Sequence, residues 1–279
     1  MNRPDNTNEG VSGELTHDTR IGDQSLTTWR TRVGRSLAQV VRWLGDRLGP
    51  NGALILTLAF GALIVLALSI AAAQIYDNVT DADGVAGLDR PLLDFAMTIR
   101  SPALNLIVVG YTEIAGPIGM PIIAVASLLV LAIHRRSWTP VILIVAAGGG
   151  SLLMTIAGKD LIGRARPPLT DAVPPYEYSA SFPSGHTLNA VAVAGVIAYL
   201  LILRQKTARA RVLTVGAAVF FAITIGLTRV YLGHHWLTDV LAGWILGAAW
   251  LALVITAHRL YLTVRARHDV RRLAPPNAA

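Results

Sequence analysis

The sequence predicts an all-α membrane protein that crosses the bilayer six times and carries further helices at the outer interface. Hydrophobic residues make up 53% of the 279 residues and charged residues only 15%, whereas an ordinary soluble domain carries about 25% charged residues. The apolar residues form long runs, and a helix needs about 20 of them to cross the hydrocarbon core. Lys and Arg gather in alternate short loops between the runs, as they do in membrane proteins of defined orientation.

Residues 1–50 are expected to form a cytoplasmic polar tail followed by an amphipathic helix. Residues 1–28 are polar and mixed in charge, so they do not resemble a cleavable signal. Between Trp29 and Leu48, apolar residues recur at steps of three and four with arginines among them. That pattern favours a helix that lies on an anionic leaflet. A solvated helix or plain disorder is the alternative.

Six apolar runs predict the membrane domain, residues 51–264. The clearest span is Ala53–Ala73, which contains no charge. The other five are Pro117–Ile133, Trp138–Ala157, Thr187–Leu203, Val212–Leu227 and Leu237–Ala257. Leu104–Ala115 is too short to cross and carries Glu113, so we expect it to form interfacial helices with residues 84–103. Residues 265–279 are expected to be a disordered cytoplasmic tail.

The distribution of positive charge places both termini in the cytoplasm of a multi-pass plasma-membrane protein. Arginines crowd the segment before the first span and the segments after the second, fourth and sixth, all on one side of a six-span chain. The first loop on the other side is instead rich in aspartate. Residues 158–184 break the rule, because this external loop holds Lys159, Arg164 and Arg166. Binding of an anionic ligand explains cations at that position.

Composition also excludes several classes of function. The net charge of +7 suggests binding to nucleic acid. The basic residues lie beside hydrophobic spans, however, and attraction to anionic lipid head groups explains their position there. No nucleic-acid partner is therefore expected. The chain has no cysteine, which excludes disulfides, thiolate chemistry and cysteine-based metal sites.

Three short polar clusters lie at ends of the predicted spans, on the outer side. The first contains Lys159 and, seven residues on, Arg166-Pro167. Lysine acts as a mobile point charge and arginine as a planar fork for phosphate oxygens. Snorkelling of both side chains to lipid head groups is the alternative.

The second and third clusters add histidines. In Pro183-Ser184-Gly185-His186, serine suits a helix N-cap and glycine lets a ligand approach the backbone, so an anion can bind there. In the third cluster Arg229 precedes His235, and Asp239 follows four residues after that histidine. On a helix Asp239 lies one turn from His235 and can accept a hydrogen bond from one imidazole nitrogen, leaving the other to attack. Simple capping of a helix is the alternative.

The ordered set of clusters resembles the tripartite signature of the type-2 phosphatidic acid phosphatase superfamily, which also includes vanadium haloperoxidases. The matching pattern is Lys159-x6-Arg166-Pro167, Pro183-Ser184-Gly185-His186 and Arg229-x5-His235-x3-Asp239. One residue departs from it, because Thr228 stands where the superfamily usually has serine. Threonine keeps the hydroxyl, so we expect little consequence.

The resemblance implies hydrolysis of a phosphate ester through a phosphohistidine intermediate. It makes His235 the nucleophile, Asp239 the residue that orients it, and His186 the general acid and then the base that activates water. It also implies that the phosphate oxygens are bound by Lys159, Arg166, Ser184, Gly185 and Arg229. No metal or other cofactor is implied, since permanent cations take the place of Mg²⁺.

Neighbouring residues receive smaller roles from the sequence. His234 is expected on the same helix as His235, about 100° away from it and at the interface. Arg164 either assists substrate binding or meets head groups. Tyr176 and Glu177 are candidates for the mouth of the site.

The expected substrate is a lipid with a terminal phosphate or diphosphate. An undecaprenyl diphosphate is the first choice, because an outward-facing site suits recycling of a carrier released outside. Phosphatidic acid or phosphatidylglycerol phosphate is the alternative, since all three share the reacting group. A membrane transporter is the non-enzyme alternative, but transport favours ionisable residues near mid-membrane, and the span interiors here are nearly without charge.

Overall fold

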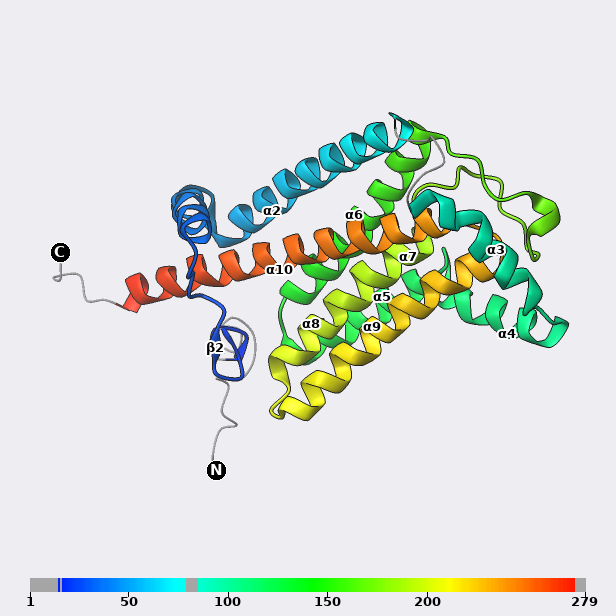
Figure 1. Ribbon diagram of the computed structural model, residues 1–279. Coiled ribbons are helices and arrows are strands. Elements are labelled where there is room, and N and C mark those ends of the chain that lie inside the picture. The colour runs from blue at the N-terminus through cyan, green and yellow to red at the C-terminus, as the bar shows by residue number, and fades with distance from the viewer. Residues whose placement is uncertain (1–14, 16, 79–84, 274–279) are drawn as a thin grey trace, which may run out of the picture.

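The computed structural model describes residue 15, residues 17–78 and residues 85–273 (Figure 1). Apart from two short paired strands, the regular elements of this part of the chain are helices, so the all-α prediction is confirmed. The elements are β1 (Arg20–Ile21), β2 (Gln24–Ser25), α2 (Arg32–Asn78), η2 (Val85–Leu88), α3 (Asp89–Thr98), α4 (Pro102–Thr112), η3 (Glu113–Ala115), α5 (Gly119–Arg135), α6 (Thr139–Ile162), η4 (Leu169–Asp171), α7 (Gly185–Asn189), η5 (Ala190–Ala194), α8 (Gly195–Arg204), α9 (Ala208–Tyr231) and α10 (Leu237–Leu273).

Four helical stretches within the described residues are long and apolar enough to cross a membrane. They are α6, the run Gly185–Arg204 formed by α7, η5 and α8, then α9, and α10 as far as Ala266. The pair Pro102–Ala115 and Gly119–Arg135 passes the same test together but bends by 45°, which makes a fifth span if the pair is counted as one. The chain is therefore a multi-pass membrane protein. A count of six stays a prediction, because part of Ala53–Ala73 lies outside the described side chains.

Helix α2 consists of two straight parts joined at Gly49, which has the non-helical angles φ 75° and ψ 168°. Glycine tolerates a positive φ because it has no Cβ. The first part contains the helix that the sequence predicted, and it buries Ala38 and Val41 against Val264 of α10. Larger apolar residues on its other sides remain at the surface, Val33 being 79% exposed. The face with Ala38 and Val41 therefore packs against the protein, and the apolar residues on the other faces are left for contact with lipid.

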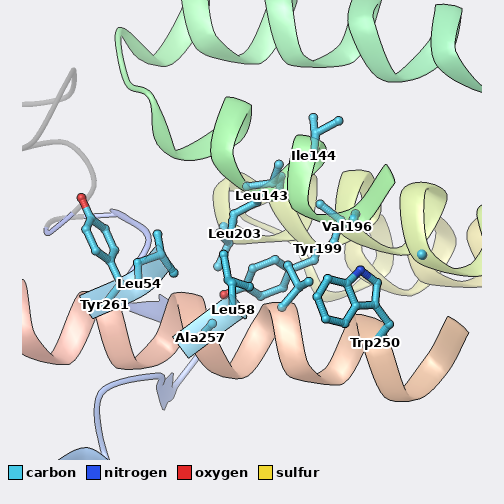
Figure 2. Close-up of a cluster of buried hydrophobic side chains, with 14 of the residues drawn as sticks. Leu54, Leu58, Leu143, Ile144, Val196, Tyr199, Leu203, Trp250, Ala257 and Tyr261 are labelled. Carbon is cyan, nitrogen blue, oxygen red and sulfur yellow. The ribbon is translucent and has the colours of Figure 1, made fainter. Parts of the chain in front are cut away.

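The core lies where α6, α8 and α10 meet the second part of α2 (Figure 2). Trp250 of α10 fills the space beside Gly150 of α6, where a Cβ atom would come within 2.2 Å of the indole ring. The indole N–H of Trp250 donates to the Ala146 carbonyl at 3.1 Å. Close approach at glycine is how membrane helices gain van der Waals contact without a hydrophobic driving force between them. The packed core fixes the relative positions of the helix ends that carry the polar clusters.

Helix α10 continues to Leu273, so the tail that the sequence predicted to be disordered from residue 265 is helical up to this point. Extending an existing helix adds one hydrogen bond for each residue that is ordered, so continuation costs little. The two prolines of the tail follow only at positions 275 and 276. The rest of the predicted tail lies outside the described residues.

The N-terminal segment also folds onto the bundle, at the end where α5 and α8 finish. Asp18 has no exposed surface, and its carboxylate accepts from Arg204 Nε at 2.6 Å and pairs with Arg135 Nη1 at 3.2 Å. Arg259 of α10 donates to the Leu26 carbonyl at 2.9 Å. The polar segment therefore supplies the counter-charge for two arginines at the helix ends.

Replacing Asp18 by asparagine removes the buried ion pair between its carboxylate and Arg135. Removing one member of a buried ion pair costs about 3–5 kcal/mol, so we expect Asp18→Asn to lower the free energy of unfolding by about that amount. Denaturant titration of the detergent-solubilised protein measures the change. Asp23→Asn, in the same segment but exposed, is the control and should stay within about 0.5 kcal/mol of the unsubstituted protein.

Candidate active site

The three predicted clusters meet at the end of the bundle where α3 and α4 lie, opposite the C-terminal end of α10 (Figure 1). Lys159 stands in the last turn of α6, and Arg166 in the loop that follows. Ser184 is the N-cap of α7, and Gly185 and His186 form its first turn. Arg229 lies in the last turn of α9, and Asp239 in the first turn of α10. His235 lies in the turn that joins these two helices.

His235 and Asp239 are neighbours, although not for the reason that the sequence suggested. His235 precedes α10 instead of sharing a helical face with Asp239. The chain turns at Gly233, which has φ 70° and packs so closely that a Cβ atom would lie 2.5 Å from the Asp171 carbonyl oxygen. Asp239 then caps α10 by accepting from the Trp236 N–H at 2.9 Å. The Nδ1 atom of His235 lies 3.5 Å from Asp239 Oδ2.

The imidazole of His235 is buried and directed at a cation. Its Nε2 atom lies 3.2 Å from Arg166 Nη1, and only 2% of the residue is exposed. Burial, together with Arg229 and Arg166, lowers the pKa of His235 to about 4 against the opposing hydrogen bond to Asp239. The ring is therefore neutral at neutral pH, as a nucleophile must be.

Two residues outside the predicted set hold Asp239 in place. Arg164 donates to Asp239 Oδ1 at 2.5 Å and to Asp89 Oδ2 of α3 at 2.8 Å. The Ser181 hydroxyl donates to Asp239 Oδ2 at 2.5 Å. Arg164 thus orients the carboxylate, which is neither of the two roles that the sequence offered. Nothing in the sequence pattern signalled Asp89, since it is one of several aspartates in the first predicted external segment and lies 75 residues before Arg164.

Glu177 occupies the space between two of the predicted phosphate-binding arginines. One carboxylate oxygen pairs with Arg166 Nη2 at 2.8 Å and the other with Arg229 Nη2. Although burial opposes its charge, Arg229 and Arg166 lower the pKa of Glu177 to about 2. The sequence placed this residue only at the mouth of the site. In the structure it is an internal anion where a phosphate group is expected.

The other predicted phosphate ligands have protein partners of their own. Lys159 Nζ donates to Ser179 Oγ at 2.6 Å and to the Ala180 carbonyl at 2.9 Å. Ser184 is fully buried; its N–H donates to the Asp239 carbonyl at 3.2 Å, and its hydroxyl accepts from Thr187. The serine therefore joins α7 to α10 without capping the helix through its side chain.

Arg229 is also fully buried and lies against α4. Its Nη1 atom donates to Thr112 Oγ1 at 3.3 Å, and the hydroxyl of Thr228 donates to the same oxygen at 3.0 Å. Thr228, which stands where the signature usually has serine, thus still provides a hydroxyl for a buried hydrogen bond. This contact supports the expectation that the substitution has little effect.

A cavity of about 800 Å³ opens beside these groups. Its polar end is lined by Lys159, Glu177, Gly185, His186, His234 and His235. Its other end runs between α5 and α6 along apolar residues that include Met120, Leu128 and Ile144. His234 is buried, with Nε2 2.7 Å from the Val173 carbonyl oxygen, so its predicted interfacial position is wrong: the turn before α10 directs it inward. Arg229 and Asp239 lie behind the cavity wall.

Comparison with known proteins decides the family. Residues 138–261 match the PAP2 superfamily. Phosphatidylglycerophosphatase B of Bacillus subtilis (strain 168) is 35% identical over 188 residues, which cover 66% of this chain and 88% of that protein. The chain belongs to the PAP2 superfamily. The crystal structure of a transmembrane PAP2 type phosphatidylglycerolphosphate phosphatase from Bacillus subtilis matches the fold with a TM-score of 0.59 at 27% identity, covering 80% of this chain and 98% of that one.

Membership confirms the resemblance seen in the sequence and gives the chain its class of activity. This PAP2 protein is a membrane phosphatase, which hydrolyses phosphoric esters. The matched residues contain the second and third clusters and also Lys159 and Arg166 of the first. The non-enzymatic transporter alternative is therefore set aside.

Glu177 must leave the two arginines, or share them, when a phosphate group binds between them. We expect Glu177→Gln to remove this competition, so inorganic phosphate and vanadate should inhibit this PAP2 phosphatase at about tenfold lower concentration, which corresponds to about 1.4 kcal/mol. Inhibition curves on the purified protein measure the effect. Asp94→Asn, an exposed carboxylate on α3 paired with Arg90, is the control. Unchanged inhibition in Glu177→Gln would show that the carboxylate does not compete.

Proposed function

We propose that this protein is a lipid phosphatase that cleaves a terminal phosphate through a phosphohistidine at His235, without a metal ion. One observation carries the proposal: a buried, neutral imidazole borders a cavity and has its Nε2 atom 3.2 Å from a guanidinium group. Its other nitrogen lies near a carboxylate, which favours the tautomer that leaves Nε2 able to attack. Nucleophile, orienting group and cation are thus present in one place.

In the first step, Nε2 of His235 forms a bond to phosphorus while the bond from phosphorus to the leaving oxygen breaks. Asp239 and Ser181 stabilise the positive charge that develops on the ring, since both have an oxygen within 3.5 Å of Nδ1. His186 lines the same cavity and donates a proton to the leaving oxygen.

In the second step, His186 accepts a proton from water, and the resulting hydroxide attacks phosphorus. The phosphorus–nitrogen bond breaks, His235 returns to its neutral form and inorganic phosphate leaves. Lys159, Arg166 and Arg229, with Ser184 and the Gly185 backbone, are proposed to bind the oxygens that do not react. Permanent cations around these oxygens supply the stabilisation that phosphoryl transfer requires.

A phosphatidylglycerol phosphate is our first candidate for the substrate, because both similar proteins carry that activity in their names. The apolar arm of the cavity, between α5 and α6, supports a lipid, since an acyl chain can lie there while the phosphate meets His235. The undecaprenyl diphosphate that the sequence favoured is the second candidate, supported by the proposed outward-facing site. Phosphatidic acid shares the same reacting ester.

We place the site at the outer face of the plasma membrane, with both termini in the cytoplasm. Helix α6 supports this orientation. It begins at Thr139, just after Arg135 and Arg136, and reaches Lys159 near its other end. A helix of 24 residues is about 36 Å long at 1.5 Å per residue, enough to separate the basic turn from the site by the thickness of a membrane.

The histidine assignments are tested by phosphate release from the purified full-length protein, with phosphatidylglycerol phosphate, phosphatidic acid and a prenyl diphosphate as substrates. We expect His235→Ala to abolish turnover, because the proposed intermediate forms on its Nε2 atom, and His186→Ala to slow it by about 10² or more, the scale of general acid catalysis. His134→Ala, an exposed histidine at the far end of α5, is the matched control. Near-normal hydrolysis by His235→Ala would reject the nucleophile.

The low pKa of His235 predicts how the nucleophile responds to acid. The ring can attack phosphorus only when it is unprotonated. Its ability to attack is therefore complete well above its pKa and is lost as the pH falls through about 4. An ordinary histidine loses competence near pH 6.5. NMR titration of labelled histidines can follow the signal that disappears in His235→Gln. A midpoint near 6.5 for that signal would contradict the burial argument.

A further inference from the structure

A second carboxylate borders the cavity, close to His186. Glu113 lies in η3, the short turn between α4 and α5, and lines the cavity together with Gly116 and His186. The residue is exposed. Among the described residues, no donor lies within hydrogen-bond distance of its carboxylate. A carboxylate ion only accepts hydrogen bonds, so this group can bind a donor that enters the cavity.

Glu113 and His186 both approach Gly116 closely. A Cβ atom on this glycine would lie 2.9 Å from Glu113 Oε2 and 3.1 Å from His186 Nε2. The Nε2 atom is buried and has no hydrogen-bond partner among the described residues. Both atoms therefore lie close to this glycine, and a polar group that enters the cavity beside it meets an acceptor and an imidazole nitrogen.

The proposed reaction determines which part of the substrate enters this space. The phosphate oxygens face Arg166 and Arg229, and His186 protonates the leaving oxygen. The leaving group must then continue from His186 into the apolar arm of the cavity, which begins at Pro117 and Met120, next to Gly116. The first atoms of the leaving group therefore pass Glu113.

We propose that Glu113 is a specificity residue that accepts a hydrogen bond from a hydroxyl of the leaving group and disfavours leaving groups that are anionic there. The inference rests on the proposed function. A phosphorylated glycerol head group carries a hydroxyl on the carbon next to the reacting ester. Cleavage of a diphosphate instead releases a lipid monophosphate, which places a second anion beside the carboxylate. Like charges placed together discriminate against the wrong partner.

Lys159 is a cation that could offset this repulsion, because it also lines the cavity. Its Nζ atom is held by Ser179 and Ala180 of the loop before α7, on the side where Arg166 also contacts Ser179. The lysine therefore belongs with the phosphate-binding cations. Arg229 also interacts with the charge of Glu113, but its guanidinium group is already paired with Glu177.

The test compares kcat/KM for phosphatidylglycerol phosphate with kcat/KM for a prenyl diphosphate, using purified full-length protein in the same detergent micelles. Wild type should prefer the phosphatidylglycerol phosphate. Glu113→Gln keeps the size but removes the charge, and should reduce this preference about tenfold, the effect of a like charge about 6 Å away in a half-exposed site. Glu113→Asp keeps the charge and should keep most of the preference. Vanadate inhibition should not change in either variant, because vanadate has no leaving group.

Asp160→Asn is the matched control, since this exposed carboxylate follows Lys159 on α6 and does not line the cavity. An unchanged ratio in Glu113→Gln would overturn the inference while the phosphatase activity stands. An equal shift in Asp160→Asn would also overturn it, by showing a general effect of surface charge. A wild-type protein that hydrolyses no lipid phosphate would overturn the proposed function, and this inference with it.

Discussion

The buried carboxylate of Asp239 is the group on which the arrangement of the site depends. It accepts hydrogen bonds from Arg164 and Ser181 of one loop and from the Trp236 N–H at the start of its own helix. Through Arg164 and Asp89 it is also tied to α3. A buried charge is tolerated only when it is paired and hydrogen-bonded, so these segments must come together for the carboxylate to be stable. The position of His235 follows from theirs.

The same requirement explains the balance of charge throughout the site. The two buried guanidinium groups of Arg166 and Arg229 share the carboxylate of Glu177, and an anionic phosphate can satisfy them in its place. A site that binds its ligand by exchanging one anion for another avoids leaving buried cations uncompensated at any stage. In the proposed reaction, phosphate competes with this carboxylate for the two arginines. The opposite end of the bundle uses the same principle, since Asp18 compensates Arg135 and Arg204 there.

The polar groups divide the cavity according to the parts of a lipid phosphate. Lys159, His186 and His235 line one end, and the groove between α5 and α6 is apolar. A chain can remain in hydrocarbon while its head group reaches the reacting residues, because the helix ends that carry the clusters lie beside the opening of the groove. The polar and apolar parts of the cavity thus match the two parts of the proposed substrate.

The sequence alone predicted the helical class, the four helical stretches that are long and apolar enough to cross a membrane, and the three polar clusters that meet at one end of the bundle, because hydropathy and motif spacing are local properties of the chain. It could not assign Arg164 or Glu177, since Asp239 lies 75 residues from Arg164 and Arg229 lies 52 residues from Glu177 in the chain. It also explained the closeness of His235 and Asp239 by a helix, whereas a turn at Gly233 and a capping bond produce it. Only tertiary packing decided these pairings, because buried charges select their partners by distance in space.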